Sequence, residues 1–228
     1  MASIASRPFP FPHNDVLEPR FTALLIIDLQ NDYLSEQGYF AKMGYDPAPL
    51  RAILPTVSRV LAAARRAGIK VIHTRQGYRA DHGDLTPYGR WRRERHGMAG
   101  STALLRGTPG YEIVPEISVA ATDYVVDKKA NGAFTYTDLD LILRAQGITH
   151  LLFAGCTTDI CVHSTMREAS DRNFECLLIE DACASGDAYA HAATIHITMV
   201  EDGLIGVVAK AQDVIDGLDG VASSAIHS

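Results

Sequence analysis

The chain has 228 residues, 47% hydrophobic and 21% charged, which fits one globular domain with a sizeable core. The net charge of −6 argues against a nucleic-acid partner, and no segment has the length and hydropathy of a transmembrane helix or a signal peptide. The four cysteines are not spaced as in a disulfide framework and form no C-x-x-C pair, so we expect free thiols and a cytoplasmic protein. We also expect no membrane partner, since no segment is apolar enough.

Residues 1–20 are rich in proline and largely polar, and they predict an arm that lies over the surface or on a partner subunit. Residues 22–28 are an apolar run that ends in a carboxylate, as is typical of a central parallel strand. Residues 76–110 are rich in glycine and arginine and indicate irregular structure. Between and beyond these segments we expect strands at 70–73, 124–127, 150–154, 175–180 and 204–208, and helices at 50–67, 137–147, from about 161 to 170, 188–201 and 211–217.

Alternating strands and helices predict an α/β fold of three layers, in which a six-stranded parallel sheet has helices on both faces. We expect a single domain over residues 1–228, with residues 1–20 as its N-terminal arm. In such sheets ligands bind beyond the carboxyl ends of the strands.

Three chemically active residues fall at such strand ends. Asp28 and Lys128 each follow an apolar run, and Cys161 lies at a helix start shortly after another. Backbone N–H groups and the helix dipole stabilise a thiolate at a helix start, so we expect a lowered thiol pKa. Cys161 is therefore the best candidate nucleophile, and a small core thiol is the alternative.

Three segments together resemble the isochorismatase-like cysteine hydrolase superfamily, whose fold is of the Rossmann type. They are residues 25–32 (LIIDLQND), 127–134 (DKKANGAF) and 155–162 (GCTTDICV).

The resemblance implies a catalytic triad in which Asp28 is the general base and acid, Lys128 the electrostatic stabiliser and Cys161 the nucleophile. Lys128 is preferred to its neighbour because the family lysine lies six residues before the phenylalanine of that motif. The family also has a cis peptide, here Cys156–Thr157, and an oxyanion hole formed by the N–H groups of Thr157 and Cys161.

Within the superfamily the chain is most similar to biuret hydrolases, through residues 73–77, 90–92, 165–172 and 175–181. It departs from them at positions that line the family pocket. The resemblance predicts four substrate-binding residues, which are Tyr33, Arg75, Asn131 and Glu201. A carboxylate at position 201 would repel an anionic substrate, and this favours a neutral ureide such as biuret or triuret.

The sequence predicts no metal and no cofactor. The region after His73 lacks the Asp-x-His pattern of the metal-binding nicotinamidases. His191 and His196 are five residues apart and face different sides of a helix, and no G-x-G-x-x-G follows a strand.

These features favour a cysteine amidohydrolase that cleaves a non-peptide carbon–nitrogen bond of a small linear ureide, through an acyl-cysteine intermediate, with release of ammonia. The alternatives are a ureidoacrylate-type amidohydrolase, a non-catalytic binding protein on the same fold and, less favoured, an isochorismate-type hydrolase, whose chemistry does not need the cysteine.

Two features bear on assembly. The family, in which dimers and tetramers are usual, and the expected exposure of Phe9 and Phe11 in the arm predict a homo-oligomer, with a tetramer as the first choice. The arginine-rich run at 90–95 is either a solvated face or a part of substrate entry or of a subunit contact.

Overall fold

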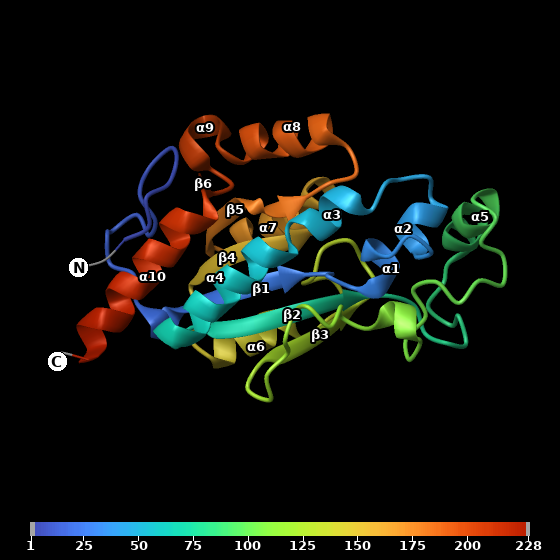
Figure 1. Cartoon of the computed structure of the whole chain (residues 1–228), viewed down its shortest axis with the longest axis horizontal. Coiled ribbons are helices and arrows are strands. Elements are labelled where there is room, and N and C mark those ends of the chain that lie inside the picture. Colours follow the sequence, from blue (N-terminus) through green and yellow to red (C-terminus); the bar gives the residue numbers. More distant parts are fainter. Residues whose placement is uncertain (1–2, 227–228) are drawn as a thin grey trace.

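The computed structural model describes residues 3–226, and its centre is a six-stranded parallel sheet in the order β3-β2-β1-β4-β5-β6 (Figure 1). The α/β fold and the number of strands predicted from the sequence are thus confirmed. The strands are β1 (Thr22–Ile27), β2 (Lys70–Gln76), β3 (Tyr124–Lys128), β4 (His150–Cys156), β5 (Glu175–Ala184) and β6 (Val207–Ala209).

Helices cover both faces of the sheet because its central strands are apolar on both sides. In β1, Leu24 and Ile26 belong to one apolar layer, and Leu25 and Ile27 belong to the other. The first layer lies under α4 (Leu54–Ala67) and α10 (Ala211–Ile226), and the second lies under α6 (Leu139–Ala145) and α7 (His163–Ser170). Each fully buried aliphatic side chain contributes about 1.5–3 kcal/mol to this packing.

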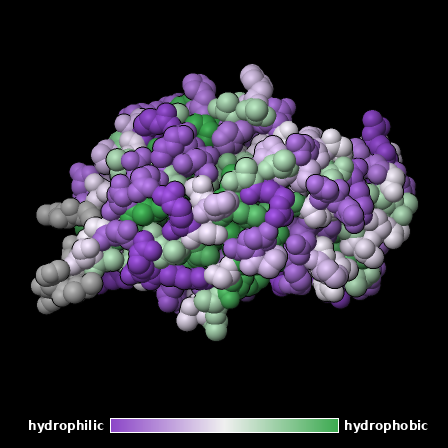
Figure 2. Space-filling model, viewed as in Figure 1, coloured by the Kyte–Doolittle hydropathy of each residue, from purple (hydrophilic) through white to green (hydrophobic). Residues whose placement is uncertain are grey.

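The remaining helices are short or lie at the periphery. No helix within residues 3–226 has both the length and the apolar character needed to cross a membrane. On the face shown in Figure 2 hydrophilic residues dominate, and hydrophobic ones show in small separate areas. The other helical segments are α1 (Asn31–Leu34), α2 (Tyr39–Lys42), α3 (Ala48–Ala52), α5 (Pro87–Arg95), α8 (Ala188–Thr198), α9 (Val200–Gly203), the 3-10 turns η1 (Pro19–Phe21) and η2 (Pro109–Tyr111), and the π-helical turn η3 (Thr158–Val162).

Several elements differ from the expectation in length. Strand β2 continues to Gln76, because the Thr74 hydroxyl and the Gln76 N–H find buried polar partners that offset the loss of water. The segment at 76–110, expected to be irregular, contains α5. The helix expected at 50–67 is divided into α3 and α4, since Pro55 has no N–H to donate to the preceding turn. The last helix extends well beyond residue 217.

The N-terminal arm lies on the chain's own sheet. Backbone hydrogen bonds of 2.9 and 2.8 Å join Arg7 to Val208 at the edge strand β6, and Ile4 pairs with Phe11 within the arm. The expectation of exposed phenylalanines is wrong for this chain, because Phe11 is completely buried and Phe9 packs half-buried against the core. A homo-oligomer stays a prediction, and these two rings no longer support it.

Candidate active site

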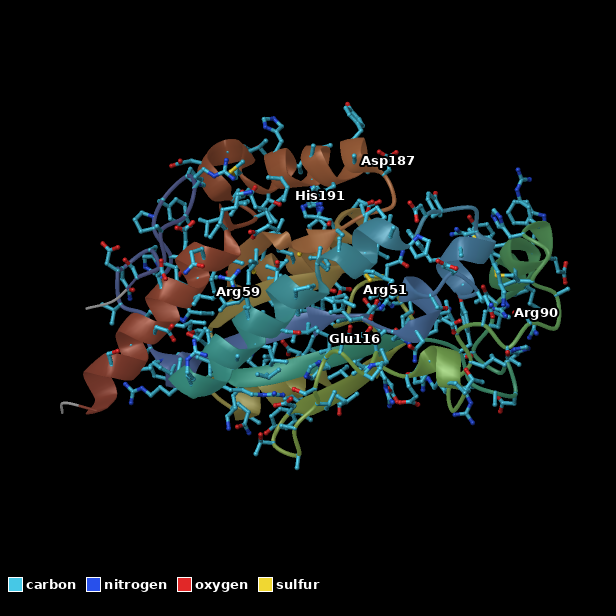
Figure 3. The ribbon with its side chains drawn as sticks, viewed as in Figure 1. Arg51, Arg59, Arg90, Glu116, Asp187 and His191 are labelled. Carbon is cyan, nitrogen blue, oxygen red and sulfur yellow. The ribbon has the colours of Figure 1, made fainter. Side chains whose placement is uncertain are left out.

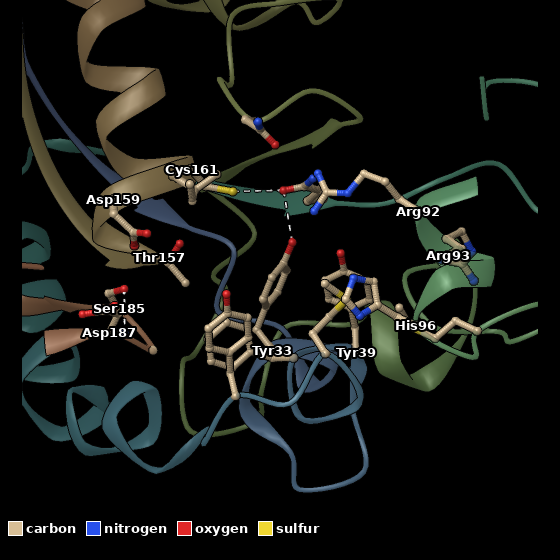
Figure 4. A pocket seen from close by; sticks show the side chains of 18 of the residues that line it. Tyr33, Tyr39, Arg92, Arg93, His96, Thr157, Asp159, Cys161, Ser185 and Asp187 are labelled. Carbon is tan, nitrogen blue, oxygen red and sulfur yellow. Dashed lines mark hydrogen bonds between the residues drawn. The ribbon is translucent and has the colours of Figure 1, made fainter. Parts of the chain in front are cut away.

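A cavity of about 380 Å³ opens at the carboxyl edge of the sheet, where the sequence predicted the site (Figure 4). Cys161 lines it, and Asp28 and Lys128 lie completely buried close behind the thiol. Aromatic side chains from the region of α1 and α2 form much of one wall, and α5 closes another. The aromatic lining residues are Tyr33, Tyr39, Phe40, Tyr45 and Tyr78.

The buried lysine uses all three of its protons on neutral oxygens. Lys128 Nζ donates to Gln76 Oε1 at 3.0 Å, to Ala130 O at 3.1 Å and to Asn131 O at 2.9 Å. Burial disfavours the ammonium, but the negative charge of Asp28 outweighs this and the pKa of Lys128 lies above its ordinary value. The loop that follows β3 thus fixes a permanent positive charge beside the thiol.

The Asp28 carboxylate keeps one oxygen available. Its Oδ1 accepts a hydrogen bond from Thr74 Oγ1 at 2.6 Å. Its Oδ2 forms an ion pair with Lys128 Nζ at 2.8 Å, outside hydrogen-bond geometry, and no other described residue donates to it. Asp28 Oδ2 is therefore an acceptor poised for a proton.

The thiol of Cys161 is neutral in this site. Its Sγ donates to Gln76 Oε1 at 3.0 Å, and burial raises the thiol pKa to about 12 although the nearby Lys128 opposes the rise. The expectation of a lowered pKa is thus wrong for this thiol, because loss of hydration outweighs the helix start and the lysine. A base must take the proton as the sulfur attacks.

The turn η3 that carries Cys161 is wider than an α-helical turn. Its first carbonyl, Thr157 O, accepts from Ile160 N at 3.2 Å and from Val162 N at 3.1 Å, and the Cys161 N–H between them is not one of its donors. The peptide between Cys156 and Thr157 is cis, as the resemblance implied. The oxyanion hole of the Thr157 and Cys161 N–H groups stays a proposal.

Two of the four predicted substrate-binding residues line the cavity, namely Tyr33 and Asn131. Arg75 does not line it. Successive side chains of a strand point to opposite faces, so Thr74 and Gln76 turn toward the site and Arg75 turns away. There its guanidinium donates to Asp127 at 2.9 Å and to Glu112 at 2.8 Å.

Glu201 also lies outside the cavity, contrary to the prediction. It is an exposed residue of α9 with a φ of 51°, beyond the far end of α8. The cavity is lined by the opposite end of that helix, at Asp187 and Ala190 (Figure 3 marks Asp187). The prediction placed the correct helix near the site but chose the wrong end.

The structure adds lining residues that the sequence analysis did not select. Figure 4 shows basic side chains from α5 on one side of the cavity, and Asp159 and Asp187 on the opposite side. Gln76 also lines the cavity, and its side-chain oxygen accepts hydrogen bonds from Tyr33 and Cys161. Gln76 could have been selected from the sequence because it lies at the carboxyl end of a strand, as Asp28 and Lys128 do. The basic residues are Arg92, Arg93 and His96.

Among residues 3–226 no three His, Cys, Asp or Glu side chains are grouped so that they could hold a metal ion. Of the two histidines considered in the sequence, His191 pairs with Thr158 Oγ1 at 2.8 Å, and His196 lies exposed further along α8.

Comparison with known proteins agrees with this geometry. Residues 22–212 match the model of the isochorismatase domain. The chain is 30% identical to ureidoacrylate amidohydrolase RutB of Agrobacterium fabrum, over 94% of this chain and 100% of the relative. A cysteine hydrolase structure from Pseudomonas syringae superposes with a TM-score of 0.77 at 23% identity, covering 90% of this chain and 95% of the other, and it shares the fold.

A second solved structure is more informative about chemistry. N-carbamoylsarcosine amidase from Thermoplasma acidophilum superposes with a TM-score of 0.65 at 27% identity, and the match covers 83% of this chain and 96% of the other. Family, fold and relatives agree with the family resemblance found in the sequence. The chain therefore belongs to the isochorismatase domain family and is an isochorismatase-like amidohydrolase.

Proposed function

We propose that the protein hydrolyses a carbon–nitrogen bond in the carbamoyl group of a small ureido acid, through an acyl-Cys161 intermediate. The observation that carries this proposal is the convergence at the cavity floor of a neutral thiol, a fixed ammonium and a carboxylate oxygen without a hydrogen-bond partner among the described residues. This is the arrangement that nucleophilic catalysis at an amide-like carbon requires.

In the first half of the reaction Cys161 Sγ attacks the carbamoyl carbon, and its proton passes to Asp28 Oδ2. Asp28 then protonates the leaving nitrogen as the carbon–nitrogen bond breaks. Lys128 stabilises the negative charge on sulfur, and the N–H groups of Thr157 and Cys161 receive the charge that develops on the carbonyl oxygen.

In the second half water attacks the acyl-Cys161, the carbon–sulfur bond breaks and the thiol regains its proton. The carbamate that is released loses carbon dioxide and yields the remaining amine. Ammonia is therefore a product whichever of the two nitrogens of the carbamoyl group leaves first.

The preference for an acid rests on Arg92. Its exposed guanidinium lines the cavity and has no carboxylate or other hydrogen-bond partner within residues 3–226. The neighbouring Arg93 also lines the cavity, but it donates to the carbonyls of Ser101 and Ala103. An arginine binds a carboxylate through two parallel hydrogen bonds, so Arg92 is suited to the acid group of a substrate.

The named relatives support the same class, since ureidoacrylate and N-carbamoylsarcosine each join a carbamoyl nitrogen to a carboxylic acid. The preference for neutral ureides relied on a carboxylate at Glu201, which lies outside the cavity. We therefore rank ureido acids above biuret and triuret.

Neutral ureides are the second candidate because of Asp159. This carboxylate lines the cavity, and its Oδ1 is buried without a hydrogen-bond partner among the described residues. An ionised carboxylate can only accept hydrogen bonds. Biuret and triuret carry N–H donors at both ends, whereas a ureido acid carries them at one end.

Ammonia release from 3-ureidoacrylate, 3-ureidopropionate, N-carbamoylsarcosine, biuret, triuret and nicotinamide tests the proposal. We expect the highest kcat/KM with a ureido acid. Arg92→Gln should lower that value about 10- to 100-fold, as for a lost charged hydrogen bond of about 1.5–3 kcal/mol. Arg95→Gln is the matched control, because Arg95 lies on the same helix and does not line the cavity.

The outcomes separate the candidates. Faster turnover of biuret or triuret, with no effect of Arg92→Gln, would favour the neutral ureides. No ammonia from any compound of the panel would refute the proposed substrate class as a whole.

A further inference from the structure

Gln76 occupies a position that neither the triad nor the family motifs explain. Its backbone is held on both sides by the completely buried Gln30, whose Oε1 accepts from Gln76 N at 2.7 Å and whose Nε2 donates to Gln76 O at 3.1 Å. Gln30 Nε2 also donates to Tyr111 O at 2.8 Å, so this buried side chain ties the end of β2 to the segment at η2 and holds the backbone of Gln76 in a fixed place. The side chain of Gln76 extends from the end of β2 to the cavity.

Three donors meet at the side-chain oxygen of Gln76. Lys128 Nζ lies at 3.0 Å, Cys161 Sγ at 3.0 Å and Tyr33 Oη at 3.1 Å. An ammonium can only donate, so the amide atom beside Lys128 must be the oxygen, and this fixes the orientation of the amide. The two N–H bonds of the amide have no protein partner among the described residues, although Gln76 lines the cavity.

We propose that Gln76 has two functions in this site: its oxygen holds the proton of Cys161 before substrate binds, and its amide N–H groups bind an oxygen of the substrate and so position the carbamoyl group over the sulfur. The first function is that of a positioning residue, which acts through Cys161. The second rests on the proposed function, because it requires a substrate with an acceptor oxygen beside the reacting carbon.

The first function follows from the partner of the thiol. Cys161 Sγ lies 3.0 Å from Gln76 Oε1 in hydrogen-bond geometry, whereas Asp28 Oδ2 has no bond of such geometry among residues 3–226. A hydrogen bond donated by the neutral thiol favours the neutral thiol. Gln76 Oε1 also accepts a hydrogen bond from Lys128 Nζ, and without Gln76 that N–H group would be available to a thiolate. Both effects keep the resting sulfur unreactive, and the proton passes from Sγ to Asp28 only during attack.

Gln76→Met tests the first function, since methionine has similar length and neither an amide oxygen nor N–H groups. The rate at which iodoacetamide alkylates Cys161 in the absence of substrate should rise at least about threefold, while kcat/KM for the best ureido acid should fall at least about tenfold. Peptide mass spectrometry assigns the alkylated cysteine. A purely structural role would lower both rates or neither, and an unchanged or slower alkylation would overturn the first function.

Gln76→Glu tests the second function, because it keeps an acceptor and removes both donors. Protection of Cys161 from iodoacetamide by 3-ureidopropionate measures occupancy of the site independently of ammonia release, and we expect Gln76→Glu to lose it. Protection and turnover at wild-type levels in this variant would overturn the second function. Gln146→Met, at the end of α6, is the control for loss of a glutamine elsewhere.

The two readouts keep this inference separate from the proposed function. If the wild-type enzyme turns over no ureido acid and none protects Cys161, the substrate assignment and the second function fail together. The alkylation rate of Gln76→Met still decides the first function, because it needs no substrate.

Discussion

The floor of the cavity and the segment that closes it are built differently. The proposed catalytic floor consists of Asp28, Lys128 and Cys161, which are almost completely buried at the ends of strands and on the turn η3. The cap segment, residues 77–111, contains α5, in which only Arg93 is buried, and it is held together by an isolated bridge between Tyr78 and Leu105 and by the bonds of Arg93 to the loop that follows α5. In the proposed mechanism the sheet supplies the reacting groups, and this mostly irregular segment contributes to substrate recognition.

The largest expected effect concerns the floor. Cys161→Ser should reduce turnover more than about 1,000-fold, because the hydroxyl is a much weaker acid than the thiol and Asp28 is a weak base for it. The fold should persist, since the exchange replaces one atom in the core. Ammonia release and the thermal unfolding midpoint measure the two effects, and a variant that keeps a tenth of the wild-type rate would contradict covalent catalysis by Cys161.

Two glycine substitutions compare the tolerance of the two regions. Gly155 in β4 has a φ of 120°, and an added Cβ would lie 2.2 Å from Ile27 O in the neighbouring strand. Gly97 in the cap segment has a φ of 66°, and an added Cβ would have no atom within 4 Å. Gly155→Ala should cost more than about 4 kcal/mol in the free energy of unfolding or prevent folding, whereas Gly97→Ala should cost about 1 kcal/mol.

Urea denaturation of the two glycine variants provides the measurement. Equal losses in the two variants would show that the left-handed backbone alone sets the cost and that the close approach of β1 and β4 contributes nothing.

A substitution at Arg93 tests whether the cap segment can be loosened without a change in the catalytic floor. Its guanidinium donates to Ser101 O at 2.7 Å and to Ala103 O at 3.0 Å, so it holds the loop that follows α5. Arg93→Met should raise KM about three- to tenfold by loosening that loop, with alkylation of Cys161 unchanged. Arg95→Met is the matched control. Slower or faster alkylation in Arg93→Met would show that the cap segment also shapes the floor.

The smallest effect is a dependence of stability on pH. Burial lowers the pKa of His163, the residue after η3, from 6.5 to about 4, and Arg167 adds to the shift. A group whose pKa is lowered by folding contributes stability above its unfolded pKa and loses it as the pH falls. We expect the free energy of unfolding to drop by about 1 kcal/mol between pH 6.5 and 4, less than the full shift would give, because the surrounding structure can relax to hydrate the imidazolium.

His163→Gln should remove that part of the acid sensitivity. The two proteins are compared by urea denaturation at several pH values, and parallel curves would show that other groups account for the loss.

The sequence predicted the floor better than the cap segment for a physical reason. The floor residues follow apolar runs, and a short run that is apolar on both faces is typical of a central parallel strand. The carboxyl end of such a strand lies at the edge of the sheet where ligands bind. Gln76 was missed because β2 continues through the polar residues Thr74 and Arg75, so that the strand seemed to end earlier in the sequence. Their partners, Asp28 and Asp127, lie far away in the sequence and become visible only when the sheet is formed.

The cap segment and the misplaced residues depend on tertiary direction. Arg75 was assigned to the site although alternation along β2 turns it to the other face. Glu201 was expected at the end of a helix over residues 188–201, but it lies in α9, beyond the end of α8 that is remote from the cavity. The arginines of α5 were left between a solvated face and substrate entry, because a helix with one buried residue has no apolar stripe from which its orientation can be derived.

The arm described for residues 3–12 also has a consequence for solubility. A sheet edge exposes unpaired N–H and C=O groups that can template association with another chain. Here the hydrogen bonds between Arg7 and Val208 occupy part of the β6 edge, and the pairing of Arg7 with Glu180 at 2.9 Å places a charge beside it. A protein without the arm would carry an open edge strand next to newly uncovered apolar core, and that edge would become a site for intermolecular strand pairing and precipitation.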